Sequence, residues 1–317
     1  PGDSTLAIGI EIGGRGLRAV LASSDGQLLE TARGIDRDLS APSLVETACG
    51  LVEQVLQRGQ VSIDAIHGIG IAFGGPVDVH RGVTIRSHRF DGFEGFPLTS
   101  VIEDRFNVRT VIENDARAAA LGEYTFGAGR GSDDMVYLHL GRGVGGGIIL
   151  GGKLIHGTSM TAGELGHMVV SANGPRCSCG KPGHLEAYAS EPSIIARMRD
   201  RLSHATAESK ATWLATSGIT VQRIFEHYDT DDDARAVIDE TVQVIGLAGA
   251  NLVTALNPDA FVIGGYVTEM GPAITAAVRS KIRQYAFDAA AYRVLVASAQ
   301  KGSDAGITGA VVLASRA

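Results

Sequence analysis

Residues 6–33 read LAIGIEIGGRGLRAVLASSDGQLLETAR and decide the fold class of this chain. The apolar run Leu6–Ile12 leads into a glycine-rich tip at residues 13–16, and a second apolar run, Leu17–Ser23, follows. A turn at Asp25-Gly26 then precedes the segment Gln27–Arg33. Apolar runs bounded by Gly and Asp-Gly indicate strands and tight turns. The stretch therefore predicts three consecutive strands, with a glycine tip between the first two.

The same order of features returns in the second half of the chain. Met135–Leu140 is a predicted strand, Gly141–Gly147 is a glycine-rich tip, and Gly147–Leu150 and Lys153–His156 are predicted strands around a turn at Gly151-Gly152. A pattern that is repeated within one chain indicates a duplicated structural unit. The two hairpins thus predict an α/β fold with two related lobes that face each other.

The segments around the two hairpins complete this organisation. Predicted helices cover Ser43–Arg58, Thr99–Phe106, Ala116–Tyr124 and most of Glu191–Ala289, and predicted strands cover Ile66–Ala72, Thr110–Ile112 and Asp259–Ile263. We place an N-terminal lobe at residues 1–116 and a C-terminal lobe at residues 117–303. The last helix, about residues 304–317, is expected to pack back on the N-terminal lobe.

Composition narrows the class of protein. A chain of 317 residues suits two lobes, and 44 % apolar residues can supply a sizeable core. The net charge of −7 disfavours nucleic-acid binding by this chain, because phosphate backbones repel it. No apolar run is long enough to predict a membrane span, and Val242–Leu256 is expected to be a buried helix. Three cysteines, with Cys177 and Cys179 too close for an ordinary disulfide, fit a reducing cytoplasm.

Glycine tips at residues 13–16, 141–147 and 264–265 each follow a predicted strand. Clustered backbone N–H groups bind phosphate well, and Gly lets the backbone approach it closely. A single tip is more often an ordinary turn. Three tips in a duplicated fold favour a phosphate site instead.

Four motifs make the sequence resemble the repressor–ORF–kinase (ROK) family of bacterial sugar kinases and sugar-responsive repressors. They are VIENDARAAALGE at Val111–Glu123, GRGVGGGIILGGKLIHG and AGELGH within Tyr137–His167, CSCGKPGHLE at Cys177–Glu186, and NPDAFVIGG at Asn257–Gly265. The resemblance spans nearly the whole chain. It implies a two-lobed, actin-like α/β fold with sugar and nucleotide in the cleft between the lobes, and it implies a homodimer or homotetramer.

By this resemblance Asp115 is the catalytic base, which takes the proton of a sugar hydroxyl as that hydroxyl attacks the γ-phosphorus of ATP. From the residues alone, Asp115 before Ala-Arg-Ala-Ala-Ala is instead a helix N-cap. The residues expected to bind the sugar are Gly75, Asn114, Asp115, Glu164, His167 and Glu186. Those expected on the nucleotide and phosphate side, with Mg²⁺ bridging the phosphates, are Gly13, Gly14, Arg15, Arg142, Gly143, Gly145 and Gly265.

A second pattern, His167, Cys177, Cys179 and His184, lies in the loop 167–186. Two thiolates and two imidazoles can complete a zinc tetrahedron, and four protein ligands are typical of a structural site. The ROK zinc motif has this spacing, with Cys at the last position, where this chain has His184. The alternative is a reduced cysteine pair in a Gly-Pro loop without metal.

Residues on the phosphate side depart from the pattern of the ROK kinases. Glu11 stands where the kinases usually have Asp, and Arg15 and Arg142 stand where they usually have Thr; on the sugar side, Arg89 stands where Asn is common. The arginines at 15 and 142 could grip donor phosphates, or they could fill the nucleotide cleft or pair with Glu11. Two functions compete accordingly. One is ATP-dependent phosphorylation of a hexose or hexose-like hydroxyl, and the other is a catalytically weak, sugar-sensing effector domain related to ROK repressors.

Overall fold

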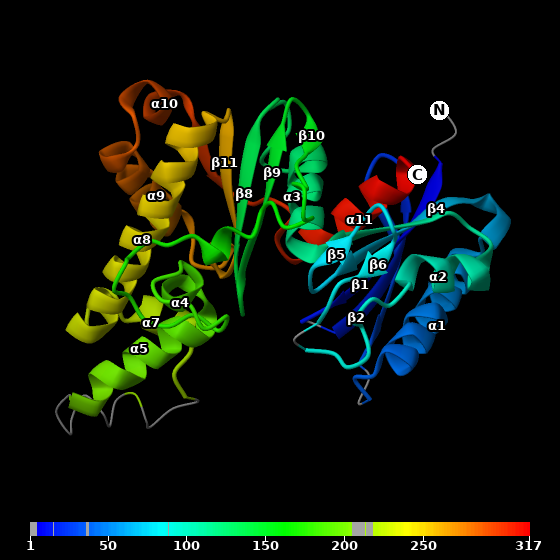
Figure 1. Ribbon diagram of the computed structural model, residues 1–317, viewed down its shortest axis with the longest axis horizontal. Coiled ribbons are helices and arrows are strands. Elements are labelled where there is room, and N and C mark those ends of the chain that lie inside the picture. The colour runs from blue at the N-terminus through cyan, green and yellow to red at the C-terminus, as the bar shows by residue number, and fades with distance from the viewer. Residues whose placement is uncertain (1–4, 15, 36–37, 88, 205–212, 214–217) are drawn as a thin grey trace.

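Two five-stranded sheets of the same topology form the framework of the protein. The computed structural model describes residues 5–14, 16–35, 38–87, 89–204, 213 and 218–317. Strand order is β3-β2-β1-β4-β7 in the first sheet and β10-β9-β8-β11-β12 in the second. In both sheets the first three strands pair antiparallel and the last two pair parallel. The shared order confirms the duplicated unit predicted from the two hairpins (Figure 1).

The first sheet is built from the first 114 residues. Its strands are β1 (Leu6–Gly13), β2 (Gly16–Ser23), β3 (Leu28–Gly34), β4 (Ile66–Phe73) and β7 (Thr110–Asn114), its helices are α1 (Ala41–Gly59) and α2 (Leu98–Phe106), and a small ribbon pairs β5 (Val77–Asp78) with β6 (Val83–Thr84). Helix α1 has apolar residues at helical spacing, and Leu44 and Val52 are fully buried against Ile8 and Ile10 of β1. This core fixes the β1–β2 hairpin, whose tip reaches the cleft.

The second sheet carries most of the helices. Its strands are β8 (Met135–Leu140), β9 (Val144–Leu150), β10 (Lys153–Leu154), β11 (Ala260–Gly265) and β12 (Leu295–Ser298). The helices around it are α4 (Glu186–Ala189), α5 (Glu191–His204), α7 (Val221–Glu226), α8 (Asp232–Leu256), α9 (Pro272–Tyr285) and α10 (Asp288–Arg293). Short 3₁₀ turns are η1 (Ile63–Ala65), η2 (Leu165–His167), η3 (Tyr266–Thr268) and η4 (Gly302–Asp304).

In this half one predicted strand is shorter than expected, and the apolar segment 242–256 lies in a largely buried helix as expected. The strand predicted over Lys153–His156 ends at Leu154, and His156 beyond it contacts Glu113. Helix α8 has the length and composition of a membrane span, but 67 % of its most apolar window is buried inside the protein, as in a core helix.

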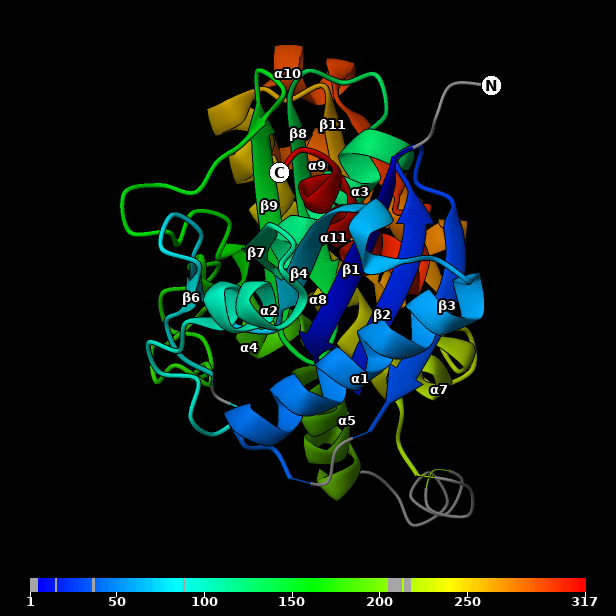
Figure 2. The same cartoon turned by 90° about the vertical axis from the view of Figure 1, so that its right-hand side faces the viewer.

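Helices α3 (Asp115–Phe126) and α11 (Ala305–Ser315) lie between the two sheets (Figure 1). Helix α11 covers the face of the first sheet opposite α1, as Figure 2 shows. Helix α11 packs closely because two glycines lie directly against its backbone. A Cβ on Gly70 of β4 would overlap the carbonyl of Ala310, and a Cβ on Gly122 of α3 would overlap the carbonyl of Ala305. The C-terminal helix thus bridges the first sheet and α3, whose N-terminus opens onto the cleft.

Candidate functional site

A cleft of about 560 Å³ lies between the sheets, where residues after β4, β7 and β8 meet. The predicted site residues that line it are Gly14, Gly75, Asn114, Asp115, Arg142, Gly143, Gly145, Glu164, His167 and Glu186. Two predicted phosphate-side residues, Gly13 and Gly265, are not among the lining residues. At Gly265 the backbone has φ +84 and abuts the carbonyl of Leu140, so this glycine serves a turn. Arg15 lies outside the described residues.

The junction of β7 and α3 places Asn114 and Asp115 at the centre of the cleft. Asn114 is the N-cap of α3: its Oδ1 accepts from the N–H groups of Ala116 at 3.1 Å and Arg117 at 3.2 Å. Its Nδ2 donates to the carbonyl of Gly75 at 3.1 Å. The capping role that the sequence offered for Asp115 therefore belongs to its neighbour. Asp115 is the first helical residue, and its carboxylate lines the cleft.

Burial changes the acidity of this carboxyl. It raises the pKa of Asp115 to about 6, and the nearby charges of Glu11 and Glu164 act in the same direction. The Ala116 N–H at 2.8 Å and the charge of Arg89 oppose the rise. A carboxylate with a pKa near 6 is ionised at neutral pH and is a better proton acceptor than an ordinary Asp.

Glu164 and His167 reach the cleft because the chain before them packs directly on β9. A Cβ on Gly163 would lie 2.8 Å from the carbonyl of Gly146, and Gly163 has φ +92, a conformation that favours Gly. Leu165 fills the space that a side chain at Gly146 would need. These glycine contacts bring two polar side chains to the wall of the cleft.

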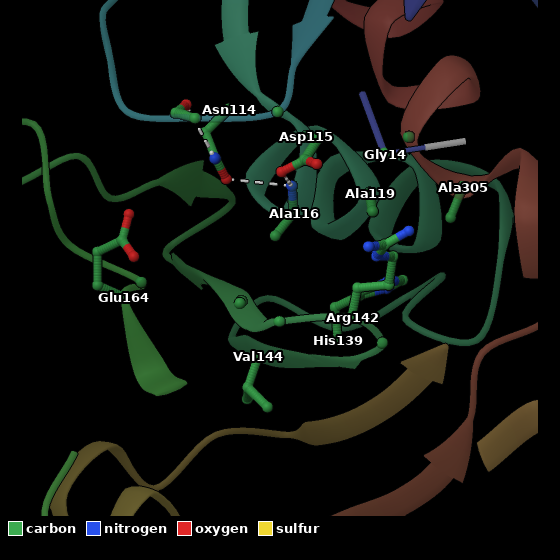
Figure 3. Close-up of a pocket in the computed structure, with 18 of the residues that line it drawn as sticks. Gly14, Asn114, Asp115, Ala116, Ala119, His139, Arg142, Val144, Glu164 and Ala305 are labelled. Carbon is green, nitrogen blue, oxygen red and sulfur yellow. Dashed lines mark hydrogen bonds between the residues drawn. The ribbon is translucent and has the colours of Figure 1, made fainter. Parts of the chain in front are cut away.

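The cleft has two chemically different ends. Figure 3 shows Glu164 on one side of Asp115, and Arg142 beside His139 on the other, with Gly14 near them. Glu164 supplies a hydrogen-bonding carboxylate at the first end. Glycine backbone and cationic side chains gather at the second. Asp115 lies between the two ends, where a hydroxyl held on one side could meet a phosphate held on the other.

The two glycine tips contribute differently to the second end. At the first tip, the guanidinium of Arg89 lies so close to Gly14 that any side chain there would overlap it. At the second tip, Arg142 is exposed and lines the cleft, and no hydrogen bond or ion pair of its side chain occurs among the described residues. Gly145 lies against α3, where a Cβ would approach that of Ala116 to 2.7 Å. Because the Arg142 side chain has no such partner among the described residues, a bound anion could contact it without breaking an ion pair.

Glu11 has a partner that the sequence did not suggest. The Arg18 guanidinium, directly opposite on β2, lies 3.2 Å from Glu11 Oε2 and 2.5 Å from Asp304 Oδ1. The carboxylate of Glu11 still lines the cleft. The network joins β1, next to the first tip, to the start of α11.

His139 is a cleft residue that the sequence analysis missed. It lies two residues before Gly141, and its Nδ1 lies 3.1 Å from the Tyr137 hydroxyl. When this hydroxyl donates to Nδ1, Nε2 carries the proton and can donate. The available signal was a polar residue inside the apolar run MVYLHL, next to a glycine tip.

The four predicted metal ligands come together beside the cleft. The ligand atoms of His167, Cys177, Cys179 and His184 all lie within 4.8 Å of one another. Cys177 Sγ is 3.7 Å from His167 Nδ1, and Cys179 Sγ is 3.3 Å from His184 Nδ1. A zinc tetrahedron with Zn–S bonds of about 2.3 Å and Zn–N bonds of about 2.0 Å separates S from N by about 3.5 Å. The donor set and its spacing therefore fit zinc.

Glu186 connects this cluster to the cleft. Its Oε1 accepts from the Ser178 hydroxyl at 2.6 Å and the Cys177 thiol at 3.3 Å, and its Oε2 accepts from the Val144 N–H at 3.1 Å. Burial opposes ionisation of Glu186, but these hydrogen bonds outweigh it and lower the pKa. The loop that could hold zinc thus also orients a carboxylate at the cleft wall.

Comparison with known proteins places the chain in a family. The model of the ROK family matches residues 7–317. A glucokinase of Halalkalibacterium halodurans is 31 % identical over 310 residues, covering 95 % of this chain and 92 % of that protein. The structure of a ROK family glucokinase from Streptomyces griseus in complex with glucose and AMPPNP has a TM-score of 0.82 and 31 % identity, covering 98 % of this chain and 100 % of that one.

Repressors are also among the relatives. A xylose repressor of Caldicellulosiruptor bescii is 28 % identical, covering 96 % of this chain and 77 % of the repressor. The family match spans nearly the whole chain, the two sheets repeat one topology, and the cleft lies between them. The chain belongs to the ROK family and has the actin-like α/β fold of its sugar kinases.

Proposed function

We propose that this protein is an ATP-dependent sugar kinase that phosphorylates a hydroxyl of a hexose or a hexose-like sugar. The position of Asp115 carries the proposal, because its carboxylate lies between the hydrogen-bonding end of the cleft and its glycine and arginine end. Relatives described as glucokinases, including one solved with glucose and AMPPNP, support the same function.

In this proposal each end of the cleft holds one substrate. Glu164, His167 and Glu186 bind sugar hydroxyls. The second hydrogen of Asn114 Nδ2 and the backbone at Gly75 bind the sugar as well. Asp115 takes the proton of the hydroxyl as that oxygen attacks the γ-phosphorus, and ADP leaves on the opposite side. Gly14, Arg142 and Gly143 hold donor phosphates. Gly13, Gly265 and Arg15 remain proposed contributors to the nucleotide end.

Two metal ions complete the proposal. Mg²⁺ commonly binds through phosphates with one or two carboxylates, and Glu11 lines the cleft at the first tip, so Glu11 with the donor phosphates would hold it. Bound there, Mg²⁺ would neutralise phosphate charge. His167, Cys177, Cys179 and His184 would hold a structural zinc that keeps Glu186 and the ring of His167 in place.

We further propose that the lobes divide near residue 117 and that the protein works in the cytoplasm as a homodimer or homotetramer. The cysteine content and the ROK relatives support the compartment and the assembly. The competing proposal, a catalytically weak sugar sensor, draws on the repressor relatives and on Arg142 at the phosphate end. A sensor would bind sugar without transferring a phosphoryl group.

The pH profile follows from the acidity of Asp115. A base must be ionised to accept a proton, so kcat/KM for the sugar should be level above the Asp115 pKa of about 6 and fall about tenfold per pH unit below it. Glu164→Gln removes a like charge that raises this pKa, so the acid limb should move to lower pH. Initial rates between pH 4.5 and 8 measure both, with Glu94→Gln, an exposed residue outside the cleft, as the matched control. If the acid limb stays at the same pH in Glu164→Gln, the limb does not report the ionisation of Asp115.

The role of Arg142 can be tested by its removal. Charge-assisted hydrogen bonds contribute about 1.5–3 kcal/mol, so Arg142→Ala should raise the KM for ATP about 10- to 150-fold and change the KM for sugar little. Arg130→Ala, an exposed arginine outside the cleft, is the control. Steady-state kinetics with ATP varied gives the result. Faster turnover in Arg142→Ala would mean that this arginine obstructs the nucleotide site.

A further inference from the structure

A buried charged cluster lies directly behind the β7–α3 junction. Glu113 and Arg117 are each 1 % exposed, and Arg117 Nε donates to Glu113 Oε1 at 2.6 Å. Glu113 Oε2 lies 2.6 Å from His156 Nε2, and Glu113 Oε1 also accepts from the Asn114 N–H at 2.8 Å. The cluster therefore links residues on both sides of Asp115 with a segment more than 40 residues away.

The same arginine holds the backbone of that distant segment. Arg117 Nη1 donates to the carbonyl of Met160 at 2.7 Å and of Ala162 at 3.4 Å. Met160 has φ 60, which is uncommon for a residue other than Gly and requires support from its surroundings. The loop closes on itself through the Ala162 N–H, which donates to the His156 carbonyl at 2.9 Å. Loop 156–162 is thus fixed at its start by Glu113 and near its end by Arg117.

Glu164 follows loop 156–162 closely in the chain. Only Gly163 separates Ala162 from Glu164, and Gly163 is already pressed against β9. Arg117 Nη2 is also buried and makes no hydrogen bond to another described residue.

We propose that Arg117 is a positioning residue, which holds loop 156–162 against the β7–α3 junction so that Glu164 faces the sugar across from Asp115. The role in sugar binding rests on the function proposed above. Glu113 and His156 serve the same end by anchoring the guanidinium and the start of the loop. One junction thereby sets both the base and a sugar ligand from the segment that follows β10.

Hydrogen exchange tests the placement of the loop without reference to any activity. In Arg117→Met the backbone amides of residues 157–164 should exchange roughly tenfold faster than in the wild type, because two loop carbonyls lose their donor. Arg279→Met is the matched control, since Arg279 also donates to a backbone carbonyl, that of Val296, outside the cleft. Arg117→Lys keeps the charge beside Glu113 but lacks the planar fork, and it should show the same change if Arg117→Met does not fold. Unchanged exchange at the backbone amides of residues 157–164 would overturn the proposal.

A double-mutant cycle tests the link to Glu164. Calorimetry with D-glucose should give a dissociation constant about tenfold higher for Arg117→Met in the wild-type background, but less than about twofold higher in a Glu164→Ala background. Full tenfold weakening in both backgrounds would show that Arg117 acts independently of Glu164 and would contradict the proposal. If the wild type binds none of a panel of hexoses, the proposed function fails, and the hydrogen exchange still decides whether Arg117 positions the loop.

Discussion

Asp115→Asn should lower kcat for sugar phosphorylation by about 10²–10⁴-fold, the usual cost of losing a positioned base. The substitution keeps the shape of the side chain, and its Oδ1 can still accept from the Ala116 N–H, now 2.8 Å away. Asn114 continues to cap α3. The dissociation constant for the sugar should therefore change by less than about threefold, since binding energy resides in other groups.

Glu164→Gln provides the contrasting result for this first prediction. It should raise the KM for sugar more than it lowers kcat, because Glu164 lies at the sugar end of the cleft and away from Arg142 (Figure 3). Steady-state kinetics and calorimetry on both variants separate the two roles. Wild-type turnover in Asp115→Asn with intact sugar binding would show that another group accepts the proton.

Removal of a zinc ligand should have the second large effect. Cys177→Ala or Cys179→Ala should reduce bound zinc from about one per chain to near zero, because only three ligands remain. The loop 167–186 would then lose its anchor and misplace His167 and Glu186. Two lost hydrogen-bonding groups, at about 0.5–1.5 kcal/mol each, weaken sugar binding by roughly 5- to 150-fold. Elemental analysis, thermal unfolding and calorimetry measure the three consequences.

Two controls sharpen the zinc prediction. Cys49→Ala removes a cysteine that is buried in α1 and should leave the zinc content unchanged. His184→Cys exchanges one good zinc ligand for another and should retain metal, whereas His184→Ala should lose it. Protein that is purified without chelator and contains no zinc would contradict the metal assignment.

The fold was predictable because its signals are local and repeated. The β1–β2 tip and the β8–β9 tip each show apolar runs broken by glycine, and a repeat of that order leaves few arrangements of the chain. The β7–α3 junction was also visible in the sequence, as polar residues before an alanine-rich helix. The first helical residue was less certain, because Asn114 and Asp115 can both cap a helix.

The contacts between distant segments could not be predicted in this way. Nothing in the sequence places Arg117 beside the carbonyls of residues 160 and 162, which lie more than 40 residues along the chain and meet it only in the fold. Glu11 pairs with Arg18, its cross-strand neighbour, whereas the sequence analysis had considered only Arg15 and Arg142 as its partners. The backbone conformation of Gly265, with φ +84 against the Leu140 carbonyl, was likewise not visible, because a glycine in a turn and a glycine that contacts a ligand are identical in sequence.

In the proposed reaction Asp115 accepts the proton of a sugar hydroxyl, so that a phosphoryl group passes from one end of the cleft to the other. Release of ADP from ATP and Mg²⁺, measured with a panel of hexoses on wild type and Asp115→Asn in parallel, tests it most directly. We predict ADP release that depends on one or a few hexoses in the wild type and falls at least about 10²-fold in the variant. Wild-type protein that binds a hexose by calorimetry but releases no hexose-dependent ADP would contradict the claim and would identify a sugar sensor instead.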